Sequence, residues 1–344
     1  MATTQYSNWA NGSSTEQYAT MLAMLERAEA DKVLDIAFDE RPHNKKEGRS
    51  ASMARWAVPA TNTTQVAEGV NNASRALVPE RVYVTLNEYS EIFSWTSQAE
   101  DMDPLDYAEG AAEVGHDLVM RDRTALKWST LTGGSQVIYN SGSISTRGGV
   151  NGVITAGRLD QAFTILRTAK GKVFKDMQMG SNKVGSAGLM PSFYVFGHEH
   201  LRPDLEACRG FQYAKDYPSD VRANPYEIGS VGAGRGRVIL SPELEPFADA
   251  GASLGSANLR STSGSNVDVY PIVVVAKGAA SCVPLRGKGN RGQGNLQVFR
   301  INTPDRSDPA NLTRLWSAVW TEGHLITNEL WVCRIEVAAT ESYT

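Results

Sequence analysis

The longest pattern of apolar and polar positions in the chain runs from Asp103 to Leu131 and is helical. Apolar or small residues recur every three or four positions, at Leu105, Ala108, Ala112, Gly115, Leu118, Val119, Ala125 and Leu126. Asp103 is expected to cap this helix, Pro104 to occupy its first position, and Gly133 to end it. A helix over residues 104–131 is about 40 Å long at 1.5 Å per residue, well beyond three or four turns. We therefore expect it to span the molecule.

The charges along this stretch support the same helix. Its first half is acidic and its second half is basic, an order that favours the partial charges at the two ends of a helix. The acidic residues are Asp106, Glu109, Glu113 and Asp117, and the basic residues are Arg121, Arg123 and Lys127.

Residues 49–97 combine two strand-like segments with a polar tip. Side chains alternate over residues 53–58, where Pro59 ends the pattern, and again over residues 82–87. The intervening residues 62–74 are small and polar and contain turn signals. The pattern predicts a long β-hairpin, and a two-stranded ribbon buries too little surface to be stable alone. We therefore expect the hairpin to lie on a partner.

The N-terminal residues 15–38 have the spacing of an amphipathic helix, with a break near Asp31. Both flanking segments, residues 7–14 and 41–49, are polar. This arrangement is typical of an arm that docks on another molecule, and it fits an ordinary first helix of a domain equally well.

The remaining chain mixes helix and strand signals, which predicts an α+β fold. Thr155 is expected to cap a helix that runs through Leu166 and stops at Gly171. Strands are expected over residues 193–196, 238–242, 267–276, 315–320 and 330–337. In the last of these, one face carries Trp331, Cys333, Ile335 and Val337. A glycine-rich segment at 287–294 is expected to be a flexible loop.

Composition narrows the possible roles. A net charge of -4 over 344 residues argues against a protein that attracts nucleic acid through an excess of positive charge. The three cysteines, Cys208, Cys282 and Cys333, are far apart and lack a CxxC pair, so we expect buried thiols without disulfides or zinc. The chain shows no secretory signal, and its longest apolar run, residues 272–276, is too short for a membrane span. We expect a soluble chain made in a cytoplasm.

No constellation of residues predicts catalysis, a metal site or a bound cofactor. The glycine-rich residues 229–237 lack the Gly-Lys-Ser/Thr ending of a phosphate loop, and a hairpin turn explains them better. His198 and His200 are two positions apart and match no HExxH pattern, so we expect one exposed and one packed imidazole. Cys208 has no nucleophile signature around it.

Three stretches resemble the major capsid proteins of tailed bacteriophages with the Hong Kong 97-like fold, in particular the subset of short-tailed phages. Residues 63–70 (TTQVAEGV) are similar to a hairpin-tip motif of that subset. The other two are residues 226–229 (YEIG) with 238–242 (VILSP), and residues 269–270 (VY) leading to 277–280 (KGAA) and 285–287 (LRG). The likeness covers roughly residues 45–290, and the order of the elements agrees with it.

The resemblance implies a division of the chain into capsid regions. The N-terminal arm is residues 1–47, and the extended loop is the hairpin of residues 48–98. The peripheral domain is 99–154, with the spine helix at 104–131, and the axial domain is 155–294. Residues 295–344 are C-terminal strands that return to the peripheral domain.

The resemblance also implies partners and no catalytic residues. Such a chain forms pentamers and hexamers of an icosahedral shell, and double-stranded DNA is packaged against its inner face without sequence specificity. A portal is expected, with a decoration protein as an option. No long charged helical segment precedes the arm, so we expect a separate scaffolding protein. The expected location is the virion, after assembly in the host cytoplasm.

Contacts between subunits are predicted at the hairpin and the spine. Trp56, Tyr83 and Val84 are expected to be buried against the next subunit. Arginines of the loop are predicted to meet carboxylates of the spine or arm of a neighbour, although both sets could also be solvated faces. The proposed contact residues are Arg49, Arg55, Trp56, Arg75, Arg81, Tyr83, Asp106, Glu109, Glu113 and Asp117. Two alternatives stay open, an encapsulin-like nanocompartment shell and an enzyme with a glycine-rich nucleotide loop.

Overall fold

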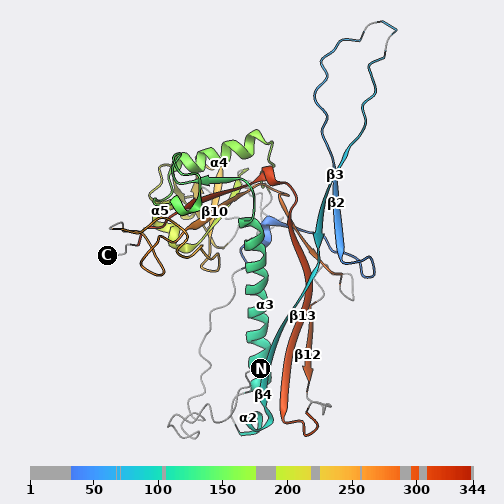
Figure 1. Ribbon diagram of the computed structural model, residues 1–344, viewed down its shortest axis with the longest axis vertical. Coiled ribbons are helices and arrows are strands. Elements are labelled where there is room, and N and C mark those ends of the chain that lie inside the picture. The colour runs from blue at the N-terminus through green and yellow to red at the C-terminus, as the bar shows by residue number, and fades with distance from the viewer. Residues whose placement is uncertain are drawn as a thin grey trace.

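A computed structural model describes residues 32–66, 68–69, 71–102, 106–175, 191–217, 225–255, 258–286, 296–301 and 308–341. Within these residues, a seven-stranded sheet, a five-stranded sheet and a two-stranded ribbon are arranged around one long helix (Figure 1). The fold is mixed α and β, as predicted. No helix within the described ranges is long and apolar enough to cross a membrane.

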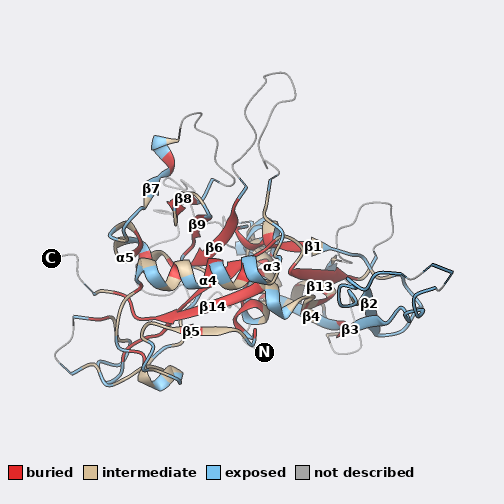
Figure 2. Cartoon of the chain, turned by 90° about the horizontal axis from the view of Figure 1, so that it is seen from above, coloured by how far each residue is buried: buried red, intermediate tan, exposed pale blue. Residues whose placement is uncertain are grey.

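The seven-stranded sheet carries the main hydrophobic core. Its strands, in spatial order, are β5 (Val137–Tyr139), β14 (Val332–Val337), β10 (Tyr270–Val275), β6 (Phe193–Gly197), β9 (Gly236–Leu240), β8 (Glu227–Val231) and β7 (Gln212–Tyr213). Every residue of β14, β10, β6 and β9 is buried (Figure 2). Both faces of the sheet are therefore covered, which is why these strands are continuous apolar runs rather than alternating patterns.

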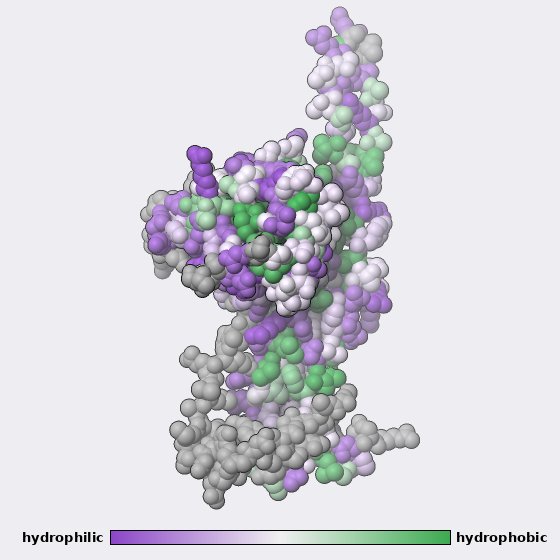
Figure 3. Space-filling view, turned by 60° about the vertical axis from the view of Figure 1, so that its left-hand side comes forward, coloured by the Kyte–Doolittle hydropathy of each residue, from purple (hydrophilic) through white to green (hydrophobic). Residues whose placement is uncertain are grey.

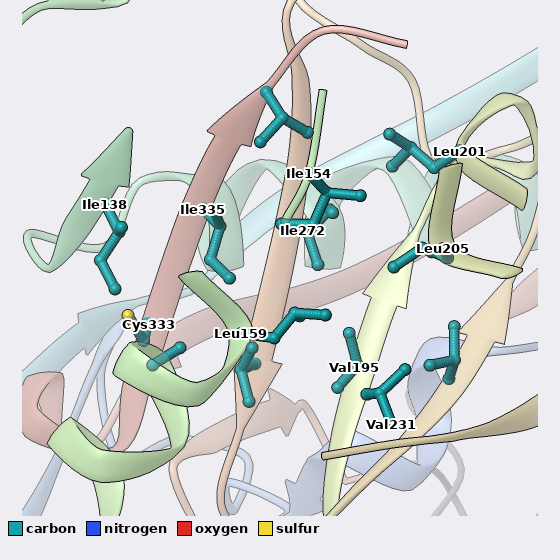
Figure 4. Packing of buried hydrophobic residues seen from close by; sticks show 14 of the residues in the cluster. Ile138, Ile154, Leu159, Val195, Leu201, Leu205, Val231, Ile272, Cys333 and Ile335 are labelled. Carbon is teal, nitrogen blue, oxygen red and sulfur yellow. The ribbon is translucent and has the colours of Figure 1, made fainter. Parts of the chain in front are cut away.

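Alternate residues of β10 point into two different cores. Ile272 and Val274 pack with Leu159 and Phe163 of helix α4 (Ala156–Thr168), on the face shown in Figure 4. Val273 and Val275 belong to a second cluster on the opposite face, where the long helix and the N-terminal segment pack. Thr155 precedes α4 as predicted, but its side chain makes no capping hydrogen bond.

Short helices connect the strands of this region. They are η3 (Arg147–Gly149), η4 (Glu199–Leu201), α5 (Arg202–Glu206), η5 (Ala214–Asp216) and η6 (Glu329–Trp331). In β14, Cys333, Ile335 and Val337 share the face toward α4, as predicted, whereas Trp331 belongs to η6 and packs beside them.

The long helix is α3 (Tyr107–Thr132), 26 residues or about 39 Å at 1.5 Å per residue. Its N-cap is Asp106, whose carboxylate accepts the backbone N–H groups of Ala108 and Glu109 at 2.9 and 3.1 Å. The predicted N-cap at Asp103 was wrong, because α3 begins at Tyr107 and the aspartate directly before it is Asp106. A separate short helix, α2 (Ser97–Met102), precedes it, and residues 103–105 lie outside the described ranges. The helix ends at Gly133, as predicted.

Helix α3 lies along the five-stranded sheet. The sheet is built on β13 (Thr313–Ile326), which pairs with β4 (Asn87–Thr96), β11 (Ala280–Pro284) and β12 (Gln297–Ile301), and β1 (Phe38–Glu40) joins β11 in parallel. Trp316 and Trp320 of β13 are buried against Val119 of the helix, together with Trp95 of β4. The helix and the sheet thus share one aromatic core, which fixes the helix along the length of β13.

The N-terminal segment differs from its predicted helix. Leu34–Ala37 forms a short 3-10 turn, η2, and Phe38 begins a strand. Phe38–Glu40 pairs in parallel with β11, and Leu34 and Ala37 are buried beside the long helix. Strand pairing therefore overrides the helical spacing at this end of the segment. The rest of the predicted helix, residues 15–31, lies outside the described ranges.

The predicted hairpin is present as the two-stranded ribbon β2 (Ser50–Trp56) and β3 (Pro79–Thr85), which pair antiparallel. Its base is anchored, because Ala51 and Val84 pack against Val283 and Leu325 of the five-stranded sheet. Val84 was predicted to be buried by a neighbouring subunit, but it is buried within its own chain. Beyond this base the ribbon projects from the body, and most of its residues are exposed (Figures 1 and 2).

Candidate functional site

The projecting ribbon has an inner and an outer face. Ala51 pairs with Val84 on the inner face, where both are buried against the body. Because side chains alternate along a strand, Trp56, Arg81 and Tyr83 all lie on the opposite, outer face. Trp56 is 64% exposed and Tyr83 is 66% exposed. We call this set of three residues the outer ribbon face.

Apolar residues also lie where the ribbon strands open toward the tip. Val58 is 92% exposed and Leu77 is 71% exposed, and the backbone N–H of Ala57 still donates to the carbonyl of Val78 at 2.9 Å. Hydrophobic side chains are visible on the surface of the ribbon in Figure 3. Neither Val58 nor Leu77 was predicted as a contact residue. Their signal in the sequence is an apolar side chain at each edge of a long polar tip.

Three of the four loop arginines have partners within their own chain. Arg55 forms an ion pair with Glu80, its cross-strand neighbour, at 2.6 Å. Arg49 donates to the carbonyl of Leu86 at 2.9 Å and to Asn87 Oδ1 at 2.7 Å, and Arg75 donates to the carbonyl of Ala60. The side chain of Arg81 makes no hydrogen bond or ion pair with any residue that the structure describes.

Three of the four carboxylates of the spine, Asp106, Glu113 and Asp117, have interactions within their own chain. Asp106 caps α3, and Asp117 forms an i,i+4 ion pair with Arg121 at 3.1 Å. Glu109 and Glu113 are exposed on the first turns of the helix. The first turns of α3 lie near the lower end of the molecule in Figure 1, and strands β2 and β3 lie well above them. The predicted contact between them therefore requires two chains.

A groove lies between the ribbon and the segments that follow α4, β10 and β13. Its volume is about 660 Å³, and residues from both faces of the ribbon, Met53 and Trp56, line one side of it. The other side is lined by Leu330 and Trp331, together with Lys170, Lys172 and Lys277. The groove adds an apolar and partly cationic surface beside the base of the ribbon.

The glycine-rich segment is a hairpin turn, as predicted. Gly232, Ala233 and Gly234 connect β8 to β9 with left-handed backbone conformations, at φ of 62°, 57° and 81°. A Cβ atom on Gly236 would lie within 2.7 Å of the Phe163 ring of α4. The glycines therefore serve the turn and its close packing on the helix.

The histidine pair is part of the packing around Tyr270. His198 is buried, and its Nδ1 accepts the backbone N–H of His200 at 2.9 Å. Burial, with smaller effects of His200 and Arg260, lowers the pKa of His198 to about 4. His200 is half-buried rather than exposed, and its Nδ1 lies 3.0 Å from the Tyr270 hydroxyl. Both rings are thus neutral structural groups at pH 7.

The thiols agree with the prediction at two of three positions. Cys282 and Cys333 are buried and free, whereas Cys208 is only half-buried, at the edge of the core under α4. Cys282 lies beside Glu322 and His324, and these three are the one group of potential metal ligands found among the described residues. Sequence inspection missed this group because about 40 residues separate the cysteine from the other two.

The comparisons with known proteins bear on the fold. No protein-family model matches the chain, and no curated protein matches its sequence. Among solved structures, the capsid of Ralstonia phage GP4 is similar at a TM-score of 0.63 and 12% identity, over 94% of both chains. The cyanophage Pam1 capsid is similar at a TM-score of 0.60 and 14% sequence identity, over 94% of this chain and 98% of that one. The acid-stable capsid of Helicobacter pylori bacteriophage KHP30 is similar at a TM-score of 0.59 and 9% sequence identity, over 95% of this chain and 98% of that one.

The chain therefore has the fold of phage capsid proteins, and the predicted Hong Kong 97-like resemblance is confirmed at the level of the fold. The likeness extends over nearly the whole of each chain.

Proposed function

We propose that this chain, which has a phage capsid fold, is the major capsid protein of a tailed phage. In this role it assembles with copies of itself into pentamers and hexamers that close an icosahedral shell around double-stranded DNA. Its location is then the virion, and its task is structural rather than catalytic. The likeness to solved capsids over more than nine-tenths of the chain supports this assignment.

The observation that carries the proposal is the projecting ribbon. An isolated two-stranded ribbon is marginal in water, and this one presents Trp56 and Tyr83 at about two-thirds exposure. Large aromatic side chains are the residues that most often contribute binding energy at protein interfaces. A ribbon of this kind is stabilised when its outer face is buried, and the described part of its own chain buries only the base.

The arrangement of the two contact regions favours rings. A ribbon at one end of a molecule that binds a surface near the other end makes a head-to-tail contact, which closes into a ring when the rotation permits. Each subunit of a shell is then held by several neighbours at once, so individually weak contacts add up to a stable position. Pentamers and hexamers are the rings that an icosahedral shell requires.

Charge sets the register of the proposed contact. Arg81 is the loop arginine whose guanidinium is not used within the described chain, and Glu109 is exposed on the spine. We assign this charge pair to the interface between neighbours, where it fixes orientation more than affinity. Arg49, Arg55 and Arg75 then stabilise the ribbon within its own chain.

The other partners follow from the proposed role. The mildly acidic chain faces packaged DNA without binding it tightly, because a net charge of -4 does not attract the negatively charged phosphates of nucleic acid. A separate scaffolding protein and a portal belong to the proposal, with a decoration protein as an optional addition. The division into arm, extended loop, peripheral and axial domains is proposed with the boundaries given above.

Assembly of the full chain tests the proposal directly. Sedimentation velocity and negative-stain microscopy of the purified protein should reveal rings or closed particles. The double variant Trp56→Ser and Arg81→Glu should remain folded and shift the protein to monomers. Loss of an interface hot spot of 2 kcal/mol or more weakens each contact by about 30-fold.

A matched control uses the inner face of the same ribbon. Exchange of Arg55 and Glu80, as Arg55→Glu with Glu80→Arg, preserves their ion pair and leaves the outer face unchanged. This variant should assemble like the natural chain. A particle of one or two chains, with the ribbon folded back on its own body, would refute the proposed function.

A further inference from the structure

Three side chains with metal-binding atoms meet between β11 and β13. Cys282 of β11 lies directly across from His324 of β13 in the antiparallel register. Glu322 is two residues from His324 along the same strand, so it points to the same face of the sheet. The Cys282 Sγ, one carboxylate oxygen of Glu322 and one ring nitrogen of His324 all lie within 4.8 Å of one another.

The group is buried and only partly satisfied by hydrogen bonds. The side chains of Glu322 and His324 are 1% and 4% exposed, and Cys282 is 5% exposed. One Glu322 oxygen accepts from Arg123 Nε at 2.8 Å, and the other lies 3.2 Å from His324 Nε2. The second ring nitrogen, His324 Nδ1, is buried and has no hydrogen-bond partner. A buried polar atom without a partner is costly, and ligation of a metal ion by this nitrogen would supply the partner.

We propose that Cys282, Glu322 and His324 bind a single zinc ion between β11 and β13. Sulfur, imidazole nitrogen and carboxylate oxygen together are the donors that Zn²⁺ prefers, usually in a tetrahedral arrangement. Glu40 pairs with Cys282 in the parallel ladder of β1 and β11 and interacts electrostatically with Cys282 and Glu322, but it is exposed and does not belong to the group of three. The fourth position of a tetrahedral ion would be left to a water molecule.

The charges balance when the ion binds. A thiol loses its proton when it ligates Zn²⁺, so one proton leaves to solvent for each ion bound. The thiolate and the Glu322 carboxylate neutralise the two positive charges of the ion. Arg123 Nε continues to donate to Glu322 Oε2, and this hydrogen bond orients the carboxylate toward the ion.

The proposed ion has a structural consequence that is independent of shell assembly. It would join β11 and β13 at the point where α3 contributes Arg123. Zinc should therefore stabilise the sheet that carries the spine helix, in the free subunit as well as in any particle. A ligand that binds the native state alone raises the unfolding temperature with its concentration.

Cobalt substitution of the full-length protein tests the site. The reduced protein is stripped with a chelator and titrated with Co²⁺, which reports thiolate ligation by a charge-transfer band in the near ultraviolet. We expect the band to saturate at one equivalent and to disappear when Zn²⁺ is added. Cys282→Ser should abolish the band, and Arg123→Gln should weaken cobalt binding by about 10- to 100-fold, as expected for loss of an outer-shell partner.

Cys208→Ser provides the control, because Cys208 is the more exposed thiol and lies in the other core. This variant should keep the full band. The absence of a thiolate–cobalt band from the natural chain would overturn the site, whatever the folding of the variants. A band that persists in Cys282→Ser would overturn it equally.

Discussion

Gly115 is a position where α3 packs directly on Trp316 of the five-stranded sheet. A Cβ atom on this glycine would have three atoms of the Trp316 ring within 2.6 Å, whereas ordinary carbon contacts are near 3.5 to 4 Å. Trp316 is only 4% exposed and packs against Phe93 with ring centroids 5.6 Å apart. The ring therefore has no open space into which it can move, and Gly115→Ala should force the helix and the sheet apart.

Two opposing effects decide the magnitude. Alanine favours a helix over glycine by about 1 kcal/mol, because glycine loses more backbone entropy. Overpacking of a buried site costs about 1–3 kcal/mol, and an overlap of more than 1 Å with a rigid ring belongs at the upper end. The net effect of Gly115→Ala should be a destabilisation of about 2 kcal/mol.

Gly110 provides a matched control in the same helix. A Cβ atom there has no neighbour within 4 Å, so Gly110→Ala should gain the helix propensity alone and stabilise by about 0.5–1 kcal/mol. Urea unfolding of both variants, followed by far-ultraviolet circular dichroism, measures the two free energies. Equal stabilisation by both substitutions would refute the close packing of α3 on Trp316.

Two further predictions concern buried ionisable groups. The pKa of His198 is lowered to about 4 in the folded chain, so the unfolded chain takes up the proton first as the pH falls. Stability should decline by about 3 kcal/mol between pH 6.5 and 4, and urea unfolding across that range should show a smaller decline in His198→Asn. Glu227→Ala leaves the guanidinium of Arg237 buried without its ion pair at 2.8 Å, and should cost about 3–5 kcal/mol in the same assay. Removal of Glu206, which pairs with the half-exposed Arg202, should cost less than about 1 kcal/mol.

Elements defined by short-range patterns could be predicted from the sequence. The alternation around Trp56 and Tyr83 specified the two strands of the ribbon, and the apolar run near Val273 specified a strand buried on both faces. The glycine turn at 232–234 was predictable because left-handed backbone favours glycine. In each case the signal lies within a few residues along the chain.

Errors arose where distant segments decide the local structure. Phe38 fits a helical spacing, but its backbone pairs with Ala280, more than 200 positions later in the chain. The half-burial of His200 depends on Tyr270, and the burial of Val84 depends on Val283. The order of residues does not show which strands become neighbours, so these outcomes required the fold.

The same limit applies to the predicted contact residues, and it changes their proposed roles. The sequence grouped four loop arginines together, but the strand register places two of them on different faces, with Arg55 paired to Glu80 on the inner face and Arg81 on the outer face. An arginine that already has a carboxylate partner gains little from a second one across an interface, since the first pair must be exchanged. An exposed tryptophan has no such competing partner in water, and burial of its ring is favourable on any complementary surface. Affinity between neighbouring chains should therefore depend on Trp56 and Tyr83, and Arg81 should decide how they are aligned.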